Sequence, residues 1–287
     1  MKTRTVAVIM TILVCASVVH AGVSYTAVTK TRDAKGRSQQ TSKMRAVVDG
    51  MNARIDFDSG KNGAVPRGGY LLTRDGAKTV FMVNTQEETY MKWDIDKLAG
   101  MAGSIMQMAG GMLNMSVTNH KNEKLLDEKG PTMMGVPTRH YKFLTRYGME
   151  VNVMGFKQKS DVATEQEIWA GQGLADDATA LWKRITSFKT GIEDIDKLIA
   201  DEAGKVKGFP LRTIVKSTTT DQRGRKQTTE TVTEVTDMKK LKPNPKIFVI
   251  PNTYTEEQME LPPGNSSAKG ENNPAAAING LLKSFGR

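Results

Sequence analysis

The chain contains one cysteine among its 287 residues, Cys15, and that cysteine lies inside a leader-like segment. Residues 1–21 begin with two basic side chains, continue with a short apolar run and end in small residues, which is the order of a secretory signal. We therefore predict a signal peptide over residues 1–21 and an exported, periplasmic chain that begins at Gly22. Val14 stands where a lipidation signal has a small residue, so we expect ordinary cleavage rather than lipidation of Cys15.

Without the leader, the chain has no cysteine and only two histidines, His120 and His140. This inventory excludes disulfides and most zinc and nucleophilic chemistry, and the sequence contains no GxSxG, HExxH or CxxC motif. Adjacent carboxylates such as Glu87 and Glu88 fit turns better than acid–base catalysis. The sequence therefore predicts a protein that is not an enzyme, with no cofactor and no metal site built from histidine or cysteine.

Long apolar runs are also missing. The apolar run of the leader is too short to cross a bilayer, for which about 20 residues are needed. No charge occurs from Ala99 to Asn119, but this stretch contains four glycines and several polar residues, too many for a hydrocarbon core. We therefore expect no spanning helix.

The net charge of the chain is +10 at neutral pH, and its Lys and Arg residues are spread evenly along the sequence. An even spread favours a solvated basic surface over a dedicated binding patch, with attraction to anionic lipid as the alternative. Nucleic acid is not expected as a partner, because the sequence has no cluster of basic and aromatic residues.

What the sequence does contain is a period-two alternation of apolar and polar residues, interrupted by Asp-Gly turn signals. Helical spacing occurs over residues 94–114 and 176–203, and a segment rich in Pro, Gly, Asn and Ser precedes the C-terminal residues. We predict one domain over residues 22–260, followed by a linker and a short amphipathic tail over residues 261–287. The alternation predicts strands near residues 22–32, 38–48, 51–58, 69–74, 77–84, 88–93, 115–128, 138–147, 149–157, 163–170, 208–220 and 225–237.

The most unusual stretch is rich in methionine and glycine. Helical steps of three and four residues place six side chains in one apolar stripe: Leu98, Met101, Ile105, Met108, Met112 and Met115. Three interpretations remain open. The stripe is part of the core, or a flexible cover over an apolar ligand to which methionine can adapt, or a thioether site for Cu(I).

Several local patterns, in the same order along the chain, resemble an uncharacterised exported family related to the bacterial lipoprotein-localisation carriers. The residues that carry the resemblance are 71–76 with 80–83 and 88–90, then 135–141 with 167–170, and finally 208–212 with 248–251 and Tyr254. The resemblance covers about residues 23–259 and implies an α+β fold that is mainly antiparallel β. The expected architecture is an unclosed, curved half-barrel of about 11–12 strands with helices covering the concave face.

In the characterised carriers the concave face shelters lipid acyl chains, so the resemblance implies a lipid or a lipidated protein as the partner. It also implies that the methionine stripe contacts this ligand. The alternative is a structural or interaction module of the cell envelope that binds no small ligand. In that case the tail would dock to an envelope membrane surface or a partner through Ile278, Leu281, Leu282 and Phe285.

Overall fold

The computed structural model describes residues 22–59, 68–95, 97, 113–153, 156–173, 194, 196–197, 200–201, 204–242 and 244–257. Most of these residues form one large β-sheet and a short 3₁₀ helix, and residues 95, 97, 194, 196–197 and 200–201 have helical backbone. The strands are β1 (Gly22–Asp33), β2 (Ser38–Asp49), β3 (Asn52–Ser59), β4 (Tyr70–Thr73), β5 (Thr79–Asn84), β6 (Thr89–Asp94), β7 (Leu113–Lys129), β8 (Thr138–Val153), β9 (Phe156–Gly171), β10 (Phe209–Asp221), β11 (Lys226–Leu241) and β12 (Thr255–Glu257), and the 3₁₀ helix is η1 (Pro245–Phe248).

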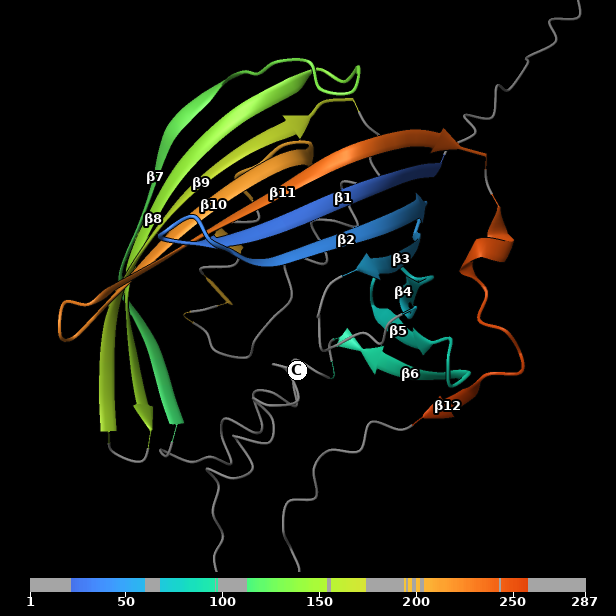
Figure 1. Cartoon of the computed structure of the whole chain (residues 1–287), viewed down its shortest axis with the longest axis horizontal. Coiled ribbons are helices and arrows are strands. Elements are labelled where there is room, and N and C mark those ends of the chain that lie inside the picture. Colours follow the sequence, from blue (N-terminus) through green and yellow to red (C-terminus); the bar gives the residue numbers. More distant parts are fainter. Residues whose placement is uncertain are drawn as a thin grey trace, which may run out of the picture.

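The sheet has twelve strands in the order β12-β6-β5-β4-β3-β2-β1-β11-β10-β9-β8-β7. Neighbouring strands are antiparallel except for β12, which pairs in parallel with β6. The first strand of the chain therefore lies in the middle of the sheet, where it pairs with both β2 and β11. Figure 1 shows that the sheet is open and strongly curved, with β7 and β12 at its two edges.

The predicted alternation explains how the central strands form. Val23, Tyr25 and Ala27 on β1 are buried, while the residues between them are more exposed, so one face of the strand faces a core. The turn after β2 contains Gly50 with a φ of 58°, a conformation that glycine adopts without a steric penalty. Local sequence therefore determines where these strands begin and end.

The prediction of strand boundaries between residues 138 and 170 was wrong. It expected three strands, near 138–147, 149–157 and 163–170, but the structure has two long strands, β8 and β9. Gly148 lies inside β8 rather than in a turn, and a Cβ atom at this position would lie 2.6 Å from Oγ1 of Thr118 on β7. The glycine therefore allows close approach of a neighbouring strand instead of ending its own strand.

The prediction that helices cover the concave face was also wrong. The described residues are nearly all sheet, with helical backbone only at residues 95, 97, 194, 196–197 and 200–201 besides the 3₁₀ helix η1, which packs on the opposite face. β7 begins at Leu113, inside the range predicted to be helical, and Met115 pairs with Val151 of β8. From Leu113 onward the residues also alternate between apolar and polar, which suits a strand, and cross-strand pairing prevails over the helical spacing.

Two groups of buried side chains lie on opposite faces of the sheet. On one face, the rings of Tyr25 (β1) and Phe209 (β10) approach to 5.0 Å between centroids, although β11 lies between their strands. Strands two positions apart are separated by about 9.5 Å, so these side chains converge, as they do on the concave side of a curved sheet. We call this the inner face.

The outer face is covered at one edge by the segment that connects β11 to β12. Phe248 of η1 is 3% exposed and packs with the buried Tyr70, Leu72 and Val83 of β4 and β5. Figure 1 shows η1 outside the curve of the sheet, next to β3 and β4. In the part of the chain that the structure describes, no helix has the length and hydropathy that a membrane span requires.

Candidate functional site

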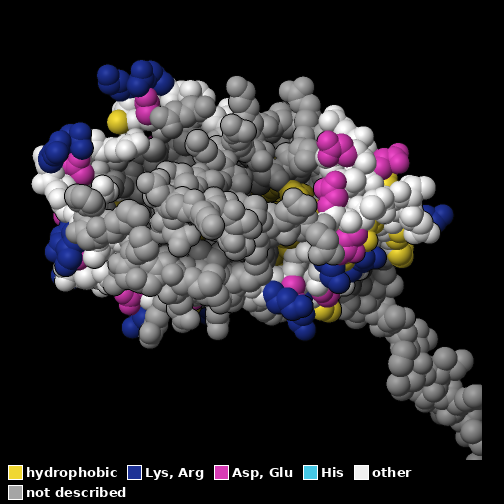
Figure 2. Space-filling model, turned by 90° about the horizontal axis from the view of Figure 1, so that it is seen from below, with side chains coloured by type: hydrophobic (Ala, Val, Ile, Leu, Met, Phe, Trp, Pro, Cys, Tyr) yellow, Lys and Arg dark blue, Asp and Glu magenta, His cyan; other side chains and the backbone are white. Residues whose placement is uncertain are grey.

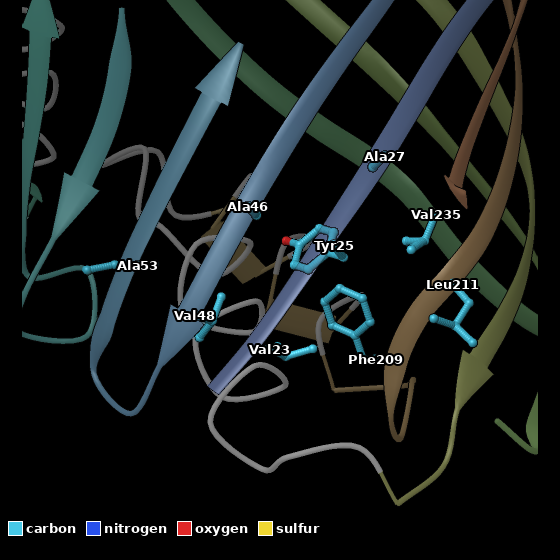
Figure 3. Close-up of a cluster of buried hydrophobic side chains, with 10 residues drawn as sticks. Val23, Tyr25, Ala27, Ala46, Val48, Ala53, Phe209, Leu211 and Val235 are labelled. Atoms are coloured by element: carbon cyan, nitrogen blue, oxygen red, sulfur yellow. The ribbon is translucent and has the colours of Figure 1, made fainter. Parts of the chain in front are cut away.

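The inner face has an apolar half, which we call the apolar patch. Ten buried side chains form it, all at most 8% exposed. Ala77 lies between β4 and β5, and the other nine come from five strands: Val23, Tyr25, Ala27, Ala46, Val48, Ala53, Phe209, Leu211 and Val235. Figure 3 shows the rings of Tyr25 and Phe209 turned toward one another in the middle of this group. Burial in these apolar surroundings raises the pKa of the Tyr25 hydroxyl from 10.0 to about 12, because the phenolate would lose its hydration.

A second apolar group lies on the neighbouring strands β8 and β9. Tyr141, Phe143, Ile168 and Ala170 are at most 4% exposed, and the rings of Tyr141 and Phe143 are stacked with centroids 6.0 Å apart. The register through β10 and β11 places these side chains on the same face as the apolar patch. The inner face is therefore apolar across at least seven of its strands, from β3 to β8 in sheet order.

Three methionines from distant parts of the sequence border the apolar patch. Met44 lies on β2, Met133 in the turn between β7 and β8, and Met238 on β11, and each is partly buried against the patch. Methionine is flexible and polarizable, so it can adjust to apolar groups of different shape. The flexible methionines at the border of the patch can therefore adapt to apolar ligands of different shape.

Toward the other end of the same strands, the inner face is lined by hydroxyl groups. Thr29 and Thr233 are bonded through their hydroxyls at 3.0 Å, and the next pair along β1 and β11, Thr31 and Thr231, at 3.3 Å. Thr164 of β9 and Ser217 of β10 form a third pair at 3.3 Å. The inner face therefore becomes richer in hydroxyl groups along the strand direction, although the buried Val162 of β9 lies beyond the third pair.

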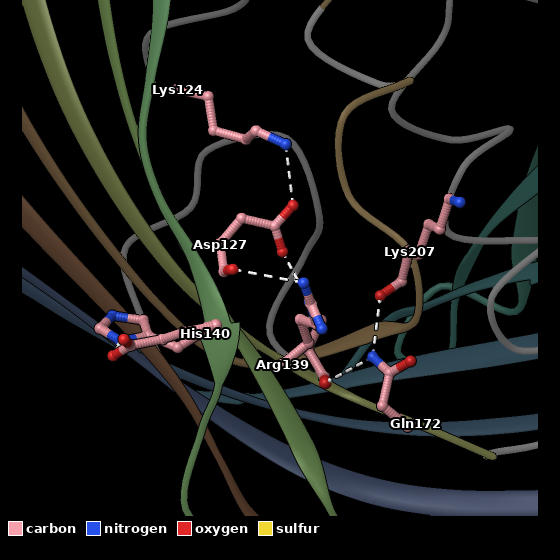
Figure 4. Close-up of polar contacts among 8 residues, drawn as sticks. Lys124, Asp127, Arg139, His140, Gln172 and Lys207 are labelled. Carbon is pink, nitrogen blue, oxygen red and sulfur yellow. Dashed lines mark hydrogen bonds and ion pairs between the residues drawn. The ribbon is translucent and has the colours of Figure 1, made fainter.

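A polar cluster stands at the apolar end of the inner face, on the edge strand β7. Asp127 accepts hydrogen bonds from Nζ of Lys124 at 2.8 Å and from Nε of Arg139 at 2.6 Å (Figure 4). These two donors hold the pKa of the Asp127 carboxyl below its usual value, Lys124 with the larger effect, and Asp127 in turn raises the pKa of Arg139. The cluster ties β7 to β8 beside the turn that carries Met133.

The side chain of the next residue after Arg139, a histidine, lies on the outer face. Figure 4 shows His140 on the other side of the strand from Arg139, as the alternation of side chains requires. Its ring stacks on Trp169 with centroids 4.4 Å apart, and the guanidinium of Arg212 lies 5.2 Å from the centroid of the same indole. Among the described residues no group of three or more His, Cys, Asp or Glu side chains is placed to hold a metal ion.

The predicted ligand-binding residues are only partly placed by the structure. Met115 lies on β7, in a strand rather than the predicted helix. The others lie outside the described residues: Leu98, Met101, Ile105, Met108 and Met112. The predicted leader, the predicted tail and most of the second predicted helical segment also lie outside them.

Sequence reasoning missed the three methionines that border the apolar patch. Met44 could have been found, because it alternates with the apolar Ala46 and Val48 on β2. Met238 could not, because a β-bulge adds one residue to β11 at Thr236 and brings Met238 to the face of Val235. Met133 lies in a turn, where no periodicity exists to read.

The fold and the site together define a class of protein: an open antiparallel sheet with an amphipathic inner face. Comparison of the sequence with protein-family models finds no match, and comparison with curated proteins finds none either. Among solved structures, the chain is similar to a putative outer membrane lipoprotein-sorting protein domain from Vibrio parahaemolyticus. The two share 12% identity with a TM-score of 0.28, and the match covers 78% of this chain and 88% of that one.

Two further solved structures are similar to this chain. One is a DUF1329 family protein from Desulfovibrio piger, with 9% identity, a TM-score of 0.27, and coverage of 80% of this chain and 90% of that one. The other is PNGF-II, with 12% identity and a TM-score of 0.32, where the match covers 83% of this chain but only 31% of PNGF-II. At TM-scores between 0.27 and 0.32 we base the function on the residues of this chain alone.

Proposed function

We propose that this protein is an exported, non-enzymatic binding protein that holds a lipid or another apolar ligand against the inner face of its sheet. The observation that carries the proposal is the amphipathic inner face. An apolar patch bordered by Met44, Met133 and Met238 passes into rows of paired hydroxyls on the same strands. The patch itself is at most 8% exposed, so acyl chains would lie against the three partly buried methionines at its border, and the polar part of the ligand would lie toward the hydroxyls.

The energy of such binding comes from removing acyl surface from water. Each buried methylene contributes about 0.8 kcal/mol, so an acyl chain needs only partial burial to bind tightly. Threonine and serine hydroxyls can donate and accept, which suits carboxyl, ester or phosphate oxygens in a lipid headgroup. The leader over residues 1–21 supports an extracytoplasmic location, where such lipids occur.

The first experiment is native mass spectrometry of the processed protein, expressed with its own leader and purified gently from the envelope fraction. We expect an additional mass that matches a lipid, and uptake of a fluorescent fatty acid by the delipidated protein. A bare mass that persists after incubation with lipids would overturn the proposal. It would favour the alternative, a structural or interaction module of the envelope.

A pair of triple variants locates the site. Changing Met44, Met133 and Met238 to Gln places an amide at three partly buried contacts with the apolar patch, and we expect at least a tenfold loss of fatty-acid affinity. The control changes Met51, Met134 and Val249, which are 56%, 41% and 53% exposed, to Gln. Equal loss in both variants would place the ligand elsewhere.

The methionine stripe remains a predicted ligand contact. Changing Met101, Met108 and Met112 to Gln in the same assay tests it, because a stripe that contacts ligand would lower the affinity on its own. Unchanged affinity would confine binding to the inner-face residues described above.

A further inference from the structure

Two hairpin turns far apart in the sequence have the same residue pattern, Asp-x-(Lys/Arg)-Gly-Arg. They are the turn between β1 and β2, residues 33–37, and the turn between β10 and β11, residues 221–225. In each turn the first aspartate accepts two backbone N–H bonds, from Lys35 and Arg37 at 2.9 and 3.0 Å in the first turn and from Arg223 and Arg225 at 2.9 Å in the second. The two turns are therefore the same local structure formed twice.

The aspartate of each turn also binds the last arginine. Oδ2 of Asp33 accepts a hydrogen bond from Nε of Arg37 at 2.7 Å, and Oδ2 of Asp221 accepts one from Nε of Arg225 at 2.6 Å. The fourth residue is a glycine in the left-handed region, with φ of 74° for Gly36 and 73° for Gly224. Both carboxylates are thus occupied inside their turns, and the cationic side chains point into solvent.

The fold brings the two turns to the same end of the sheet. β1 and β11 are antiparallel neighbours, and Asp33 at the end of β1 pairs with Thr229 near the start of β11. Figure 1 shows both hairpins at the left-hand end of the molecule, and Figure 2 shows Lys and Arg side chains gathered at that end. We call this the basic hairpin end, defined by residues 32–37 and 221–226.

The basic hairpin end carries six cationic side chains against two carboxylates, a net charge of +4, or +3 when Glu230, which lies opposite Arg32 on β11, is included. Among the described residues, no ion pair or hydrogen bond engages the side chains of four exposed cations: Arg32, Lys35, Arg223 and Lys226. The Lys and Arg residues are spread evenly along the sequence, but the fold concentrates several of them at the basic hairpin end. This concentration arises because hairpins that are distant in the chain become neighbours in the sheet.

We propose that the basic hairpin end docks this protein onto an anionic phospholipid surface. The turns expose no large apolar or aromatic side chain, whereas a specific protein partner needs such an anchor and about 800 Å² of contact on each side. An array of lipid phosphates requires only accessible cations held in place. The two hydrogen-bonded hairpin turns carry Lys and Arg side chains that form no ion pair among the described residues, and so they satisfy that requirement.

Docking at this end goes beyond the proposed ligand binding and does not depend on it. The test is flotation of the processed protein with vesicles of phosphatidylcholine and phosphatidylglycerol, compared with vesicles of phosphatidylcholine alone. We expect binding only to the anionic vesicles, and weaker binding as salt is raised, because ions screen the attraction. No binding to anionic vesicles would overturn the proposal and turn attention to an acidic protein as the partner.

The decisive variant changes Arg32, Lys35, Arg223 and Lys226 to Gln. Each cation near an anionic surface contributes about a fivefold change in binding, so we expect at least a fiftyfold loss from the four together. A control with the same change in net charge replaces four exposed lysines toward the opposite end of the strands: Lys207, Lys240, Lys242 and Lys246.

The control should retain most of the binding. Equal losses in the two variants would show that total charge, rather than the basic hairpin end, controls binding, and would overturn the proposal. The uptake of fatty acid is measured on both variants as well. Fatty-acid uptake that is unchanged while flotation is lost separates docking from ligand binding, so either proposal can fail without the other.

Discussion

Tyr25 and Phe209 meet edge to face, with ring centroids 5.0 Å apart and planes at 63°, across a strand that belongs to neither of them. The contact joins β1, the first strand of the chain, to β10, which is more than 180 residues away. It lies at the centre of the apolar patch. The curvature of the sheet therefore brings these side chains together, and their contact in turn packs the inner face.

The aromatic contact should be measurable as a coupling energy. We expect a double-mutant cycle with Tyr25→Leu and Phe209→Leu to give a coupling of about 0.5–1.5 kcal/mol in urea unfolding, the usual value for an aromatic pair. The control pairs Tyr25→Leu with Phe248→Leu, since Phe248 lies on the outer face. That pair should be additive to within about 0.5 kcal/mol. Additivity for Tyr25 and Phe209 as well would contradict the convergence of the inner face.

The buried Tyr25 hydroxyl should make stability fall in alkali. Its pKa is about 12 in the folded protein and 10.0 as the ordinary value, so between these pH values the unfolded chain loses the proton first and is favoured. The stabilisation is complete below pH 10 and disappears as pH rises through 12. Between about pH 9 and about pH 11 the wild type should lose about 1.4 kcal/mol more than the Tyr25→Phe variant. Parallel curves for the two proteins would refute this.

The segment that connects β11 to β12 should stabilise the outer face through one side chain. Phe248 is 3% exposed, whereas its neighbour Val249 is 53% exposed. We expect Phe248→Ala to lower the free energy of unfolding by about 3–5 kcal/mol, because it leaves a cavity against Tyr70, Leu72 and Val83. Val249→Ala should change it by less than about 0.5 kcal/mol. Chemical denaturation of the two variants side by side measures both values, and similar losses would rule out the packing described here.

The entry to β10 should tolerate no side chain at Gly208. Its φ is 103°, and a Cβ atom there would collide with the backbone carbonyl oxygen of Gly171. We expect Gly208→Ala to destabilise the protein by about 2 kcal/mol or more in thermal unfolding. Gly204→Ala is the matched control, because its Cβ would have only an ordinary contact of 3.7 Å with the oxygen of Ala200. It should be neutral or slightly stabilising. A tolerated Gly208→Ala would be inconsistent with this backbone geometry.

The strands that sequence reasoning located correctly are those whose signals are local. The alternation of Val23, Tyr25 and Ala27 and the Asp49-Gly50 turn specify structure within a few residues, and the predicted meander from β1 to β6 agrees with the sheet. The errors occurred where a local signal had two meanings. A glycine such as Gly148 can end a strand or allow a neighbouring strand to approach closely. The spacing of Met112 and Met115 fits a helix, but Met115 pairs with Val151 in the sheet.

The sequence by itself determined the kind of strand and the turns, because these depend on residue type and short spacing. Only the tertiary structure decided the candidate sites. A bulge at Thr236 turns Met238 toward the patch, and the pairing of β1 with β11 sets Asp33 near Thr229 and so brings the two basic turns to one end. Such neighbours are created by pairing across some 200 residues of chain, a relation that no local pattern contains.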